Sequence, residues 1–200
     1  MKFLTTLCLG LVATTFAAAE PVSKDELKRA TDHLQKTSAA FLAATEGLSE
    51  AQWNFKQAPD RWSVAECAEH IAATEDALMG MVKEKVMASG PRKDAASVKE
   101  IDDFVLTVIS DRSKKAQAPE PLLPTRRFGS PAETIKHFKN SRAETLKFVS
   151  STKDLREHAT ESPLKKDLDA YQWVLFVSAH CERHTKQILE VKADAGFPKS

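Results

Sequence analysis

Apolar residues recur at helical spacing along most of this chain. One long stretch of this kind, residues 171–191, contains neither Gly nor Pro. In a helix, steps of three and four residues return to the same face. The stretch therefore places six residues on one stripe, namely Trp173, Val177, His180, His184, Ile188 and Val191. Two histidines, one helical turn apart, thus interrupt a face that is otherwise apolar and is predicted to point into the core.

Four other segments carry the same period and are predicted to form helices. Their expected bounds are 23–45, 63–88, 94–115 and 130–153. Gly is scarce and strand signals are few, so the sequence predicts an all-α protein. Four main helices, one inserted helix at 94–115 and at least one long connection together describe a four-helix bundle with a non-trivial topology.

The apolar pattern also defines the inward faces of the second helix, 63–88, and of the inserted helix, 94–115. The expected buried stripe of the second helix comprises Cys67, His70, Ile71, Thr74, Ala77, Leu78 and Met81. That of the inserted helix comprises Val98, Ile101, Phe104, Val105 and Val108. His70 therefore occupies a core-facing stripe in the same way as His180 and His184 do.

Capping signals indicate where the helices begin. Ser23 is the expected cap of the first helix. Ser63 is followed three residues later by Glu66, the pattern of a capping box in which each side chain binds the other residue's backbone N–H. Ser130 precedes Pro131, which suits the first position of a helix. Glu66 therefore has a structural role, which makes it a weak candidate for a catalytic base.

The segment 48–63 carries two tryptophans and is predicted to be a loop. A polar loop rarely contains two tryptophans, so Trp53 and Trp62 are expected to anchor it to the bundle. We interpret both residues as packing side chains rather than as parts of a ligand site.

The Pro-rich connection 116–130 is longer than a turn between bundle helices needs to be. Together with the inserted helix, it is expected to cover one end of a site. Its two adjacent arginines, Arg126 and Arg127, are expected to be solvated rather than bound to an anionic ligand.

Residues 1–19 have the features of a secretory signal peptide. Lys2 supplies the positive start, residues 3–16 are largely apolar, and small residues end the segment at Ala19. We therefore expect cleavage after Ala19 and a periplasmic or secreted protein. The mature chain, residues 20–200, is expected to be a single helical-bundle domain.

The composition is that of an ordinary globular chain, with 42% hydrophobic and 28% charged residues. Loss of Lys2 reduces the basic residues from 29 to 28, which equals the 28 acidic residues. A neutral chain without a basic block is not expected to bind nucleic acid. No segment after the signal peptide is apolar over a length that spans a bilayer. The expected partner is a small-molecule substrate or ligand, and the sequence leaves open whether the chain forms a homodimer.

His70, His180 and His184 form the candidate metal site. Two histidines four residues apart on a helix can offer two nitrogens to one ion, and His70 is the candidate third ligand. Three buried imidazoles without partners would cost on the order of a few kcal/mol. A divalent metal removes that cost by accepting their lone pairs, and three nitrogens with open positions are typical of a catalytic site. The alternative is that the histidines only pack in the core.

Several other residues could bind a metal or act in catalysis, but the sequence does not place them in the candidate site. His33 and His137 lie outside the buried faces of their helices and are predicted to be exposed. His158 lies in a loop and has no second candidate ligand at the spacing that a metal site needs. Cys181 occupies the position at which an H-E-x-x-H metalloprotease has its general base. Glu182 is rotated by about 100° from the neighbouring position and points away from the metal face. The sequence therefore does not indicate a metalloprotease.

The two histidine segments also carry a resemblance to a known family. Trp62, Ser63, Glu66, His70 and Ile71 match a W-S-x-x-E-x-x-x-H-I-type segment. His180, His184, Gln187 and Ile188 match an H-x-x-x-H-x-x-Q-I-type segment. From the first helix to Pro198, the chain resembles the DinB-like superfamily of metalloenzymes.

This resemblance implies a four-helix bundle in up-down-down-up order. It also implies a divalent metal ion, commonly zinc, nickel or iron, held by His70, His180 and His184. Characterised relatives include thiol-dependent transferases and isomerases that use a low-molecular-weight thiol. Those thiols are cytosolic, whereas this chain is expected to be exported.

The implied topology bears on the two cysteines of the mature chain. If the second and last helices are antiparallel, Cys67 and Cys181 lie at different levels of the bundle, outside disulfide reach. Both are therefore predicted to be free thiols. Cys67 lies one turn before His70, and we expect it to be a small core residue rather than a fourth ligand.

Two functions fit these features. The first is an exported metal-dependent enzyme, a transferase or a hydrolase, whose substrate enters beneath the segment 94–130. The sequence names no general base for it. The second is a non-catalytic metal- or small-ligand-binding bundle in the cell envelope. Imidazole ligands suit several metals, so the identity of the ion is open.

Overall fold

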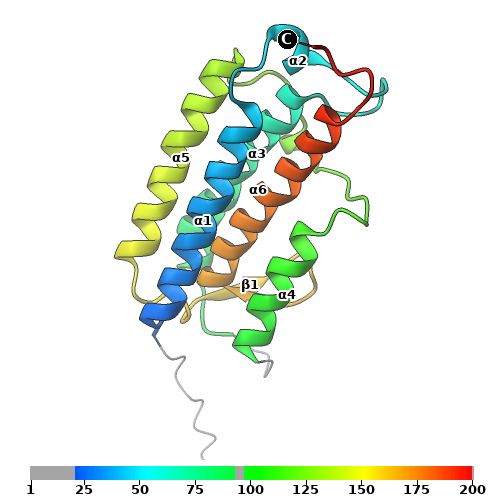
Figure 1. Ribbon diagram of the computed structural model, residues 1–200. Helices are drawn as coiled ribbons and strands as arrows, with labels where there is room; N and C mark the ends of the chain where they lie inside the picture. Colours follow the sequence, from blue (N-terminus) through cyan, green and yellow to red (C-terminus); the bar gives the residue numbers. More distant parts are fainter. Residues whose placement is uncertain (1–20, 93–96, 200) are drawn as a thin grey trace, which may run out of the picture.

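The structure, a computed structural model, describes residues 21–92 and 97–199. Four long helices form a bundle, and a further helix lies against its side (Figure 1). The bundle helices are α1 (Lys24–Thr45), α3 (Val64–Met81), α5 (Pro131–Ser151) and α6 (Ala170–Lys192), and the further helix is α4 (Val98–Ser110). The shorter elements are α2 (Glu50–Asn54), the π-helical turn η1 (Val82–Val86), the 3-10 turn η2 (Glu120–Leu122), and an antiparallel hairpin of β1 (Ala159–Glu161) and β2 (Asp167–Asp169). The predicted all-α bundle with an inserted helix is confirmed.

Polar caps begin the bundle helices where the sequence predicts them. The side chains of Ser23, Ser63 and Ser130 each accept a hydrogen bond from the third helical residue, and the glutamate at that position binds the cap in return. α6 begins with the same arrangement at Asp169. Glu66 accepts from the backbone N–H of Ser63 at 2.7 Å, so its carboxylate is committed to the cap.

α1 and α6 run parallel to one another. Near the start of both helices, the hydroxyl of Tyr171 donates to the carbonyl of Glu26 at 2.8 Å. Near the end of both, Nζ of Lys192 donates to the carbonyl of Ala44 at 2.7 Å. The two contacts together require that both helices point in the same direction, as Figure 1 shows.

α3 and α5 form a second parallel pair. Asp76 Oδ2 lies 2.5 Å from His137 Nε2, and further along both helices Nζ of Lys83 lies 5.7 Å from the centre of the Phe148 ring. Because the residue numbers on the two helices rise together, α5 points in the same direction as α3.

The two parallel pairs point in opposite directions. Between α1 and α5, Leu34 O accepts from Arg142 Nη1 at 2.6 Å, and the rings of Phe41 and Phe138 lie 4.7 Å apart. Here the residue numbers on one helix rise as those on the other fall, which is the antiparallel arrangement. The predicted up-down-down-up order is therefore confirmed.

This order explains why the bundle needs an inserted helix. Since α3 and α5 are parallel, the chain must return along the length of α3, whose 18 residues span about 27 Å, before α5 can begin. α4 makes most of this return beside α6. It begins where Val98 O accepts from Gln172 Nε2 at 3.1 Å and ends where the guanidinium of Arg183 donates to the carbonyl of Asp111. Residues 111–130, hereafter the strap, then lead to α5.

The inserted helix is shorter than predicted. It ends at Ser110 rather than near residue 115, and the expected start at Asp94 lies outside the described residues. Val98 and Val108 were expected to face inward, but they are 39% and 38% exposed. The reason is that α4 contacts the bundle along one narrow stripe. Its buried residues are Ile101, Asp102 and Val105.

The buried face of α3 also differs in part from the predicted stripe. Ala77 is exposed, whereas Glu75 and Met79 are buried. α5 packs against the side of α3 that bears Glu75, and this contact selects the buried face. The helix then passes into η1, whose wider turn continues the buried face through Val82 and Val86.

Two elements were not expected from the sequence. The predicted loop 48–63 contains α2, which Ser49 caps, and its Trp53 is buried as predicted. The hairpin of β1 and β2 closes the connection between α5 and α6. Among the described residues, no helix has both the length and the apolar character needed to cross a membrane.

A buried ion pair ties three helices of the bundle together. Arg142 on α5 donates to both carboxylate oxygens of Glu75 on α3 at 2.8 Å. The same guanidinium donates to Thr37 on α1 at 3.1 Å, and Thr145 donates to Glu75 at 2.9 Å. The side chains of the ion pair are 3% and 2% exposed. Every partner is therefore needed, because an unpaired charge at this depth is costly.

Replacing Arg142 with Met is expected to lower the free energy of unfolding by about 3–5 kcal/mol, because Glu75 would stay buried without its partner. Urea denaturation followed by circular dichroism measures this change. Lys28→Met is the matched control, since Lys28 pairs with Asp32 on the exposed side of α1. If the two variants were equally stable, the Arg142–Glu75 pair would not be a main stabilising contact of the bundle.

Candidate metal centre

The structure brings His70, His180 and His184 together. His70 projects from α3, and the other two project from α6, one turn apart. One ligand nitrogen from each residue lies within 4.8 Å of the other two, and the Nε2 atoms of His70 and His180 are 3.1 Å apart. His70 and His184 are 3% and 8% exposed, and His180 is partly exposed. The three side chains therefore form a compact, mostly buried cluster between the two helices.

Hydrogen bonds on the far side of two rings orient their nitrogens. His70 Nδ1 lies 2.9 Å from the carbonyl oxygen of Leu122, and His184 Nδ1 lies 2.9 Å from Oε1 of Gln187. Both oxygens can only accept, so each Nδ1 carries the proton. The lone pair of each Nε2 then points into the cluster. This is the arrangement in which a histidine that binds a metal is held by an outer acceptor.

The imidazoles are held in the neutral form. Burial lowers the pKa of His184 to about 3, and repulsion from His70 contributes to that shift. Burial and the two neighbouring rings hold the pKa of His180 well below its usual value. Burial also lowers the pKa of His70, although its hydrogen bond to Leu122 opposes the shift. At neutral pH the cluster therefore presents lone pairs rather than charges.

This donor set fits a divalent metal ion. Two nitrogens bound to one tetrahedral zinc at about 2.0–2.1 Å lie about 3.3 Å apart, which is close to the 3.1 Å between the Nε2 atoms of His70 and His180. A hydrogen bond from His180 can satisfy the Nε2 lone pair of His70 but not that of His184 as well, whereas one cation can bind a nitrogen of all three rings. Zinc, nickel and iron each accept imidazole nitrogen.

Trp62 forms a wall of the cluster. Its ring centre lies 4.8 Å from that of His70 and 5.9 Å from that of His184. Trp62 also packs against the core, as the sequence predicts, but its contact with two cluster residues was missed. The available signal was its place directly before Ser63, the cap of α3, because that end of α3 carries His70.

The strap closes a second side of the cluster, as expected for the segment between α4 and α5. Its Leu122 contacts His70 through the backbone, and Arg112 at its start donates to Gln187 Oε1 at 3.2 Å. Arg126 and Arg127 are exposed, as predicted, and Nε of Arg127 also donates to Glu69 at 3.2 Å. Burial alone would raise the pKa of Glu69, but backbone N–H groups of the strap hold it below its usual value.

The remaining histidines lie outside the cluster. His33 was predicted to be exposed, yet it is half-buried, because Nδ1 lies 2.6 Å from Ser178 Oγ on α6. His137 is 40% exposed and contacts Asp76. His158 lies 2.7 Å from the carbonyl oxygen of Ser89, near the hairpin.

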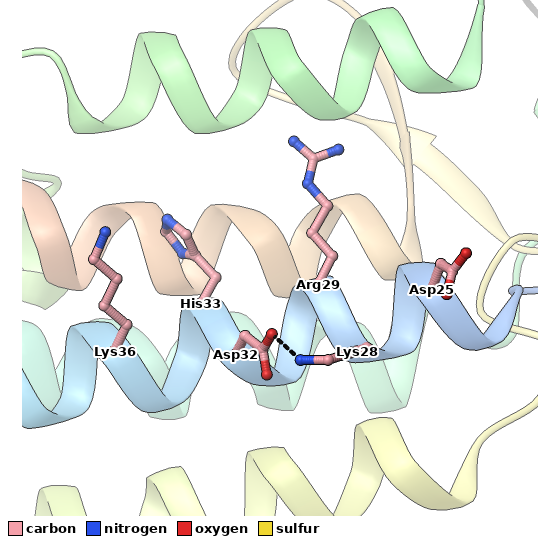
Figure 2. A pocket seen from close by; sticks show the side chains of 6 residues that line it. All are labelled: Asp25, Lys28, Arg29, Asp32, His33 and Lys36. Carbon is pink, nitrogen blue, oxygen red and sulfur yellow. Dashed lines mark hydrogen bonds and ion pairs between the residues drawn. The ribbon is translucent and has the colours of Figure 1, made fainter.

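His33 borders a surface groove of about 410 Å³ on α1 (Figure 2). Figure 2 shows Arg29 reaching toward α4, where it pairs with Asp103 at 2.6 Å, and Lys28 paired with Asp32. One ion pair, Lys28 with Asp32, thus lies within the groove, whereas Arg29 pairs with a residue of α4 outside it. The groove does not contain any residue of the histidine cluster, so we do not regard it as part of the candidate site.

The family model that matches this chain is that of the DinB superfamily, over residues 33–188. The chain belongs to the DinB superfamily. The matched range includes all three histidines of the cluster and the strap. The family expected from the two histidine segments is therefore confirmed.

Two relatives illustrate the similarity. The uncharacterized protein YuaE of Bacillus subtilis is 31% identical over 147 residues, which cover 73% of this chain and 86% of YuaE. The solved structure of YfiT from Bacillus subtilis, described as a probable metal-dependent hydrolase with an unusual four-helix bundle topology, superposes with a TM-score of 0.60. The match covers 92% of this chain and 95% of YfiT at 13% identity, so it demonstrates a shared fold.

The two cysteines that the structure describes, Cys67 and Cys181, are buried free thiols, as predicted. Cys67 is 0% exposed and is not part of the histidine cluster. Cys181 is 1% exposed and donates weakly to the carbonyl of Thr37 on α1. Burial raises the pKa of both thiols, that of Cys181 to about 11. Neither is therefore a reactive thiolate at neutral pH.

We expect neither thiol to react with iodoacetamide at about pH 8 in the folded protein, because only an accessible thiolate reacts. After unfolding in guanidinium without reductant, both should be labelled. Intact mass spectrometry counts the labels. An unfolded chain that takes up no label until it is reduced would mean that Cys67 and Cys181 form a disulfide and that this description of the bundle is wrong.

Proposed function

We propose that this protein is a metal-dependent enzyme, of hydrolase type, in which His70, His180 and His184 hold one divalent ion. The observation that carries the proposal is the convergence of three neutral imidazoles, two of which, His70 and His184, are bound at their outer Nδ1 by Leu122 and Gln187. Three protein ligands leave open coordination positions, which is typical of catalytic rather than structural sites. A divalent ion bound in this way polarises a substrate oxygen or activates a water molecule.

The side chains around the cluster have separate roles in this proposal. Leu122 and Gln187 fix the ring orientation of two ligands through Nδ1. Trp62 supplies an apolar wall that limits the access of water and can contact an apolar part of a small substrate. The substrate would reach the metal between the strap and the partly exposed His180.

The relationship to YfiT supports a hydrolase over a thiol-dependent transferase. YfiT, which shares the fold, is described as a probable metal-dependent hydrolase. We also propose that the chain is exported, and the low-molecular-weight thiols used by the transferases are cytosolic. Water, by contrast, is available as a co-substrate in every compartment.

A second candidate is a non-catalytic metal- or small-ligand-binding bundle in the cell envelope. The observation that favours it is the lack of an evident general base among the residues that the structure describes. Glu66 is bound in its cap, and Glu69 is bound to the strap. Glu190 pairs with Arg112, and Glu182 pairs with Lys186. Turnover of an ester or amide panel by the metal-loaded protein, abolished by chelation, would decide for the enzyme.

Elemental analysis of the untagged protein should find about one divalent ion per chain. A His180→Ala/His184→Ala variant should lose the ion while its helical circular dichroism persists. His33→Ala/His137→Ala is the matched control, because it removes two histidines outside the cluster and should keep the ion. If wild-type protein holds no metal, and if added zinc or nickel leaves its thermal stability unchanged, the three histidines only pack in the core.

We further propose that residues 1–19, which lie outside the described part of the structure, form a signal peptide, and that residues 20–200 are one domain. Expression in a Gram-negative host should then yield a periplasmic protein whose mass begins at Glu20. Cell fractionation and intact mass spectrometry measure both properties. A chain that keeps residues 1–19 and stays in the cytosol would refute export without affecting the proposed metal site.

A further inference from the structure

The strap contacts the outer side of His70 directly and is linked to the outer side of His184 through Gln187. Its Leu122 carbonyl accepts from His70 Nδ1 at 2.9 Å, over a separation of 52 residues. At its beginning, Arg112 donates to the same oxygen of Gln187 that contacts His184. The orientation of the histidines therefore depends on where the strap lies, although the strap itself contributes no histidine.

One carboxylate fixes the far end of this strap. Glu69 accepts the backbone N–H groups of three consecutive strap residues, those of Thr125 and Arg127 at its Oε1 and that of Arg126 at its Oε2. The distances are 2.7, 3.2 and 2.7 Å, respectively. Arg127 Nε adds a fourth contact at 3.2 Å. Glu69 is 6% exposed, so it is withdrawn from solvent and almost entirely occupied by the strap.

The backbone of the strap is shaped to receive this carboxylate. Arg126 has a φ of 63°, in the left-handed region that side-chain-bearing residues seldom adopt. A left-handed residue within such a turn makes consecutive N–H groups point to one side and form a concave site for an anion. The unfavourable conformation is thus maintained by the contacts that Glu69 makes.

Glu69 directly precedes His70 on α3, so the two side chains leave the helix about 100° apart. They nevertheless bind the same segment, since Leu122 lies only three residues before Thr125. Pro124 stands between them and restricts the backbone. A movement of the strap at Thr125 is therefore transmitted to the carbonyl of Leu122.

We propose that Glu69 is a positioning residue of the metal centre. By holding the strap at residues 125–127, it keeps the Leu122 carbonyl on His70 Nδ1 and so directs the Nε2 lone pair of His70 into the cluster. The proposal rests on the proposed function as far as metal binding is concerned, but the effect on His70 is a property of the metal-free protein. Loss of such an outer contact typically lowers metal affinity by about 10- to 100-fold.

The test compares Glu69→Gln with wild type in the full chain. Gln has the same shape, but its amide nitrogen is a donor that faces backbone donors, so the strap should be released. Nitrogen NMR of the metal-free protein distinguishes the two tautomers of His70. We expect the Nδ1–H form in wild type and a loss of that preference in the variant. Zinc affinity, measured by competition with a chelator, should fall by about 10- to 100-fold.

Glu66→Gln is the matched control. Glu66 lies one turn earlier on the same helix and binds Ser63 and Lys56, but not the strap. Its loss should reduce stability while leaving the tautomer of His70 and the zinc affinity as in wild type. If Glu69→Gln also keeps the wild-type tautomer of His70 and the wild-type zinc affinity, the proposal is overturned and Glu69 only stabilises the fold.

Two further outcomes remain decisive. If Glu69→Gln does not fold, Arg127→Ala replaces it, because this variant removes the side-chain contacts to Glu69 and to the Leu123 carbonyl. A smaller loss of the Nδ1–H preference of His70 and a smaller fall in zinc affinity support the proposal. A wild-type tautomer together with wild-type zinc affinity overturns it. If wild-type protein binds neither zinc nor nickel nor iron, the proposed function fails, and the His70 tautomer alone decides whether Glu69 positions this residue.

Discussion

The structure depends on one constraint, which is that three neutral imidazoles share a buried site between α3 and α6. Their lone pairs converge because two Nδ1 atoms are bound on the outer side, and burial keeps the rings uncharged. Such a cluster is stable only if every nitrogen has a partner. The first half of α3 therefore lies beside the second half of α6, where the three side chains meet.

The helix order of the bundle has a consequence for the rest of the chain. With α1 parallel to α6 and α3 parallel to α5, one connection has to return along the length of the bundle. α4 makes that return, so the strap reaches α5 at the end of the bundle where the histidines lie. The topology thus requires the inserted segment, and this segment also supplies the outer contact to His70 and holds Gln187, the outer partner of His184.

Much of the fold follows from local signals. The serine caps of α1, α3 and α5 lie where the sequence predicts them, because a capping box involves residues only three positions apart. The histidine stripe of α6 was likewise apparent from its period. Ala77 and Val108 were placed wrongly, because periodicity identifies an apolar face but not how wide a strip of it the neighbouring helices cover.

The sequence by itself therefore determined the five long helices, the serine caps of α1, α3 and α5, and the three histidines that face inward, since these depend on spacings of three or four residues. The family resemblance added the helix order. Only the tertiary structure decided what surrounds the cluster. The contact of Leu122 with His70, that of Glu69 with the strap, and the partial burial of His33 against Ser178 join residues 52 to 145 positions apart. A backbone carbonyl or a single carboxylate leaves no periodic signal, so such partners become evident only when the helices are packed together.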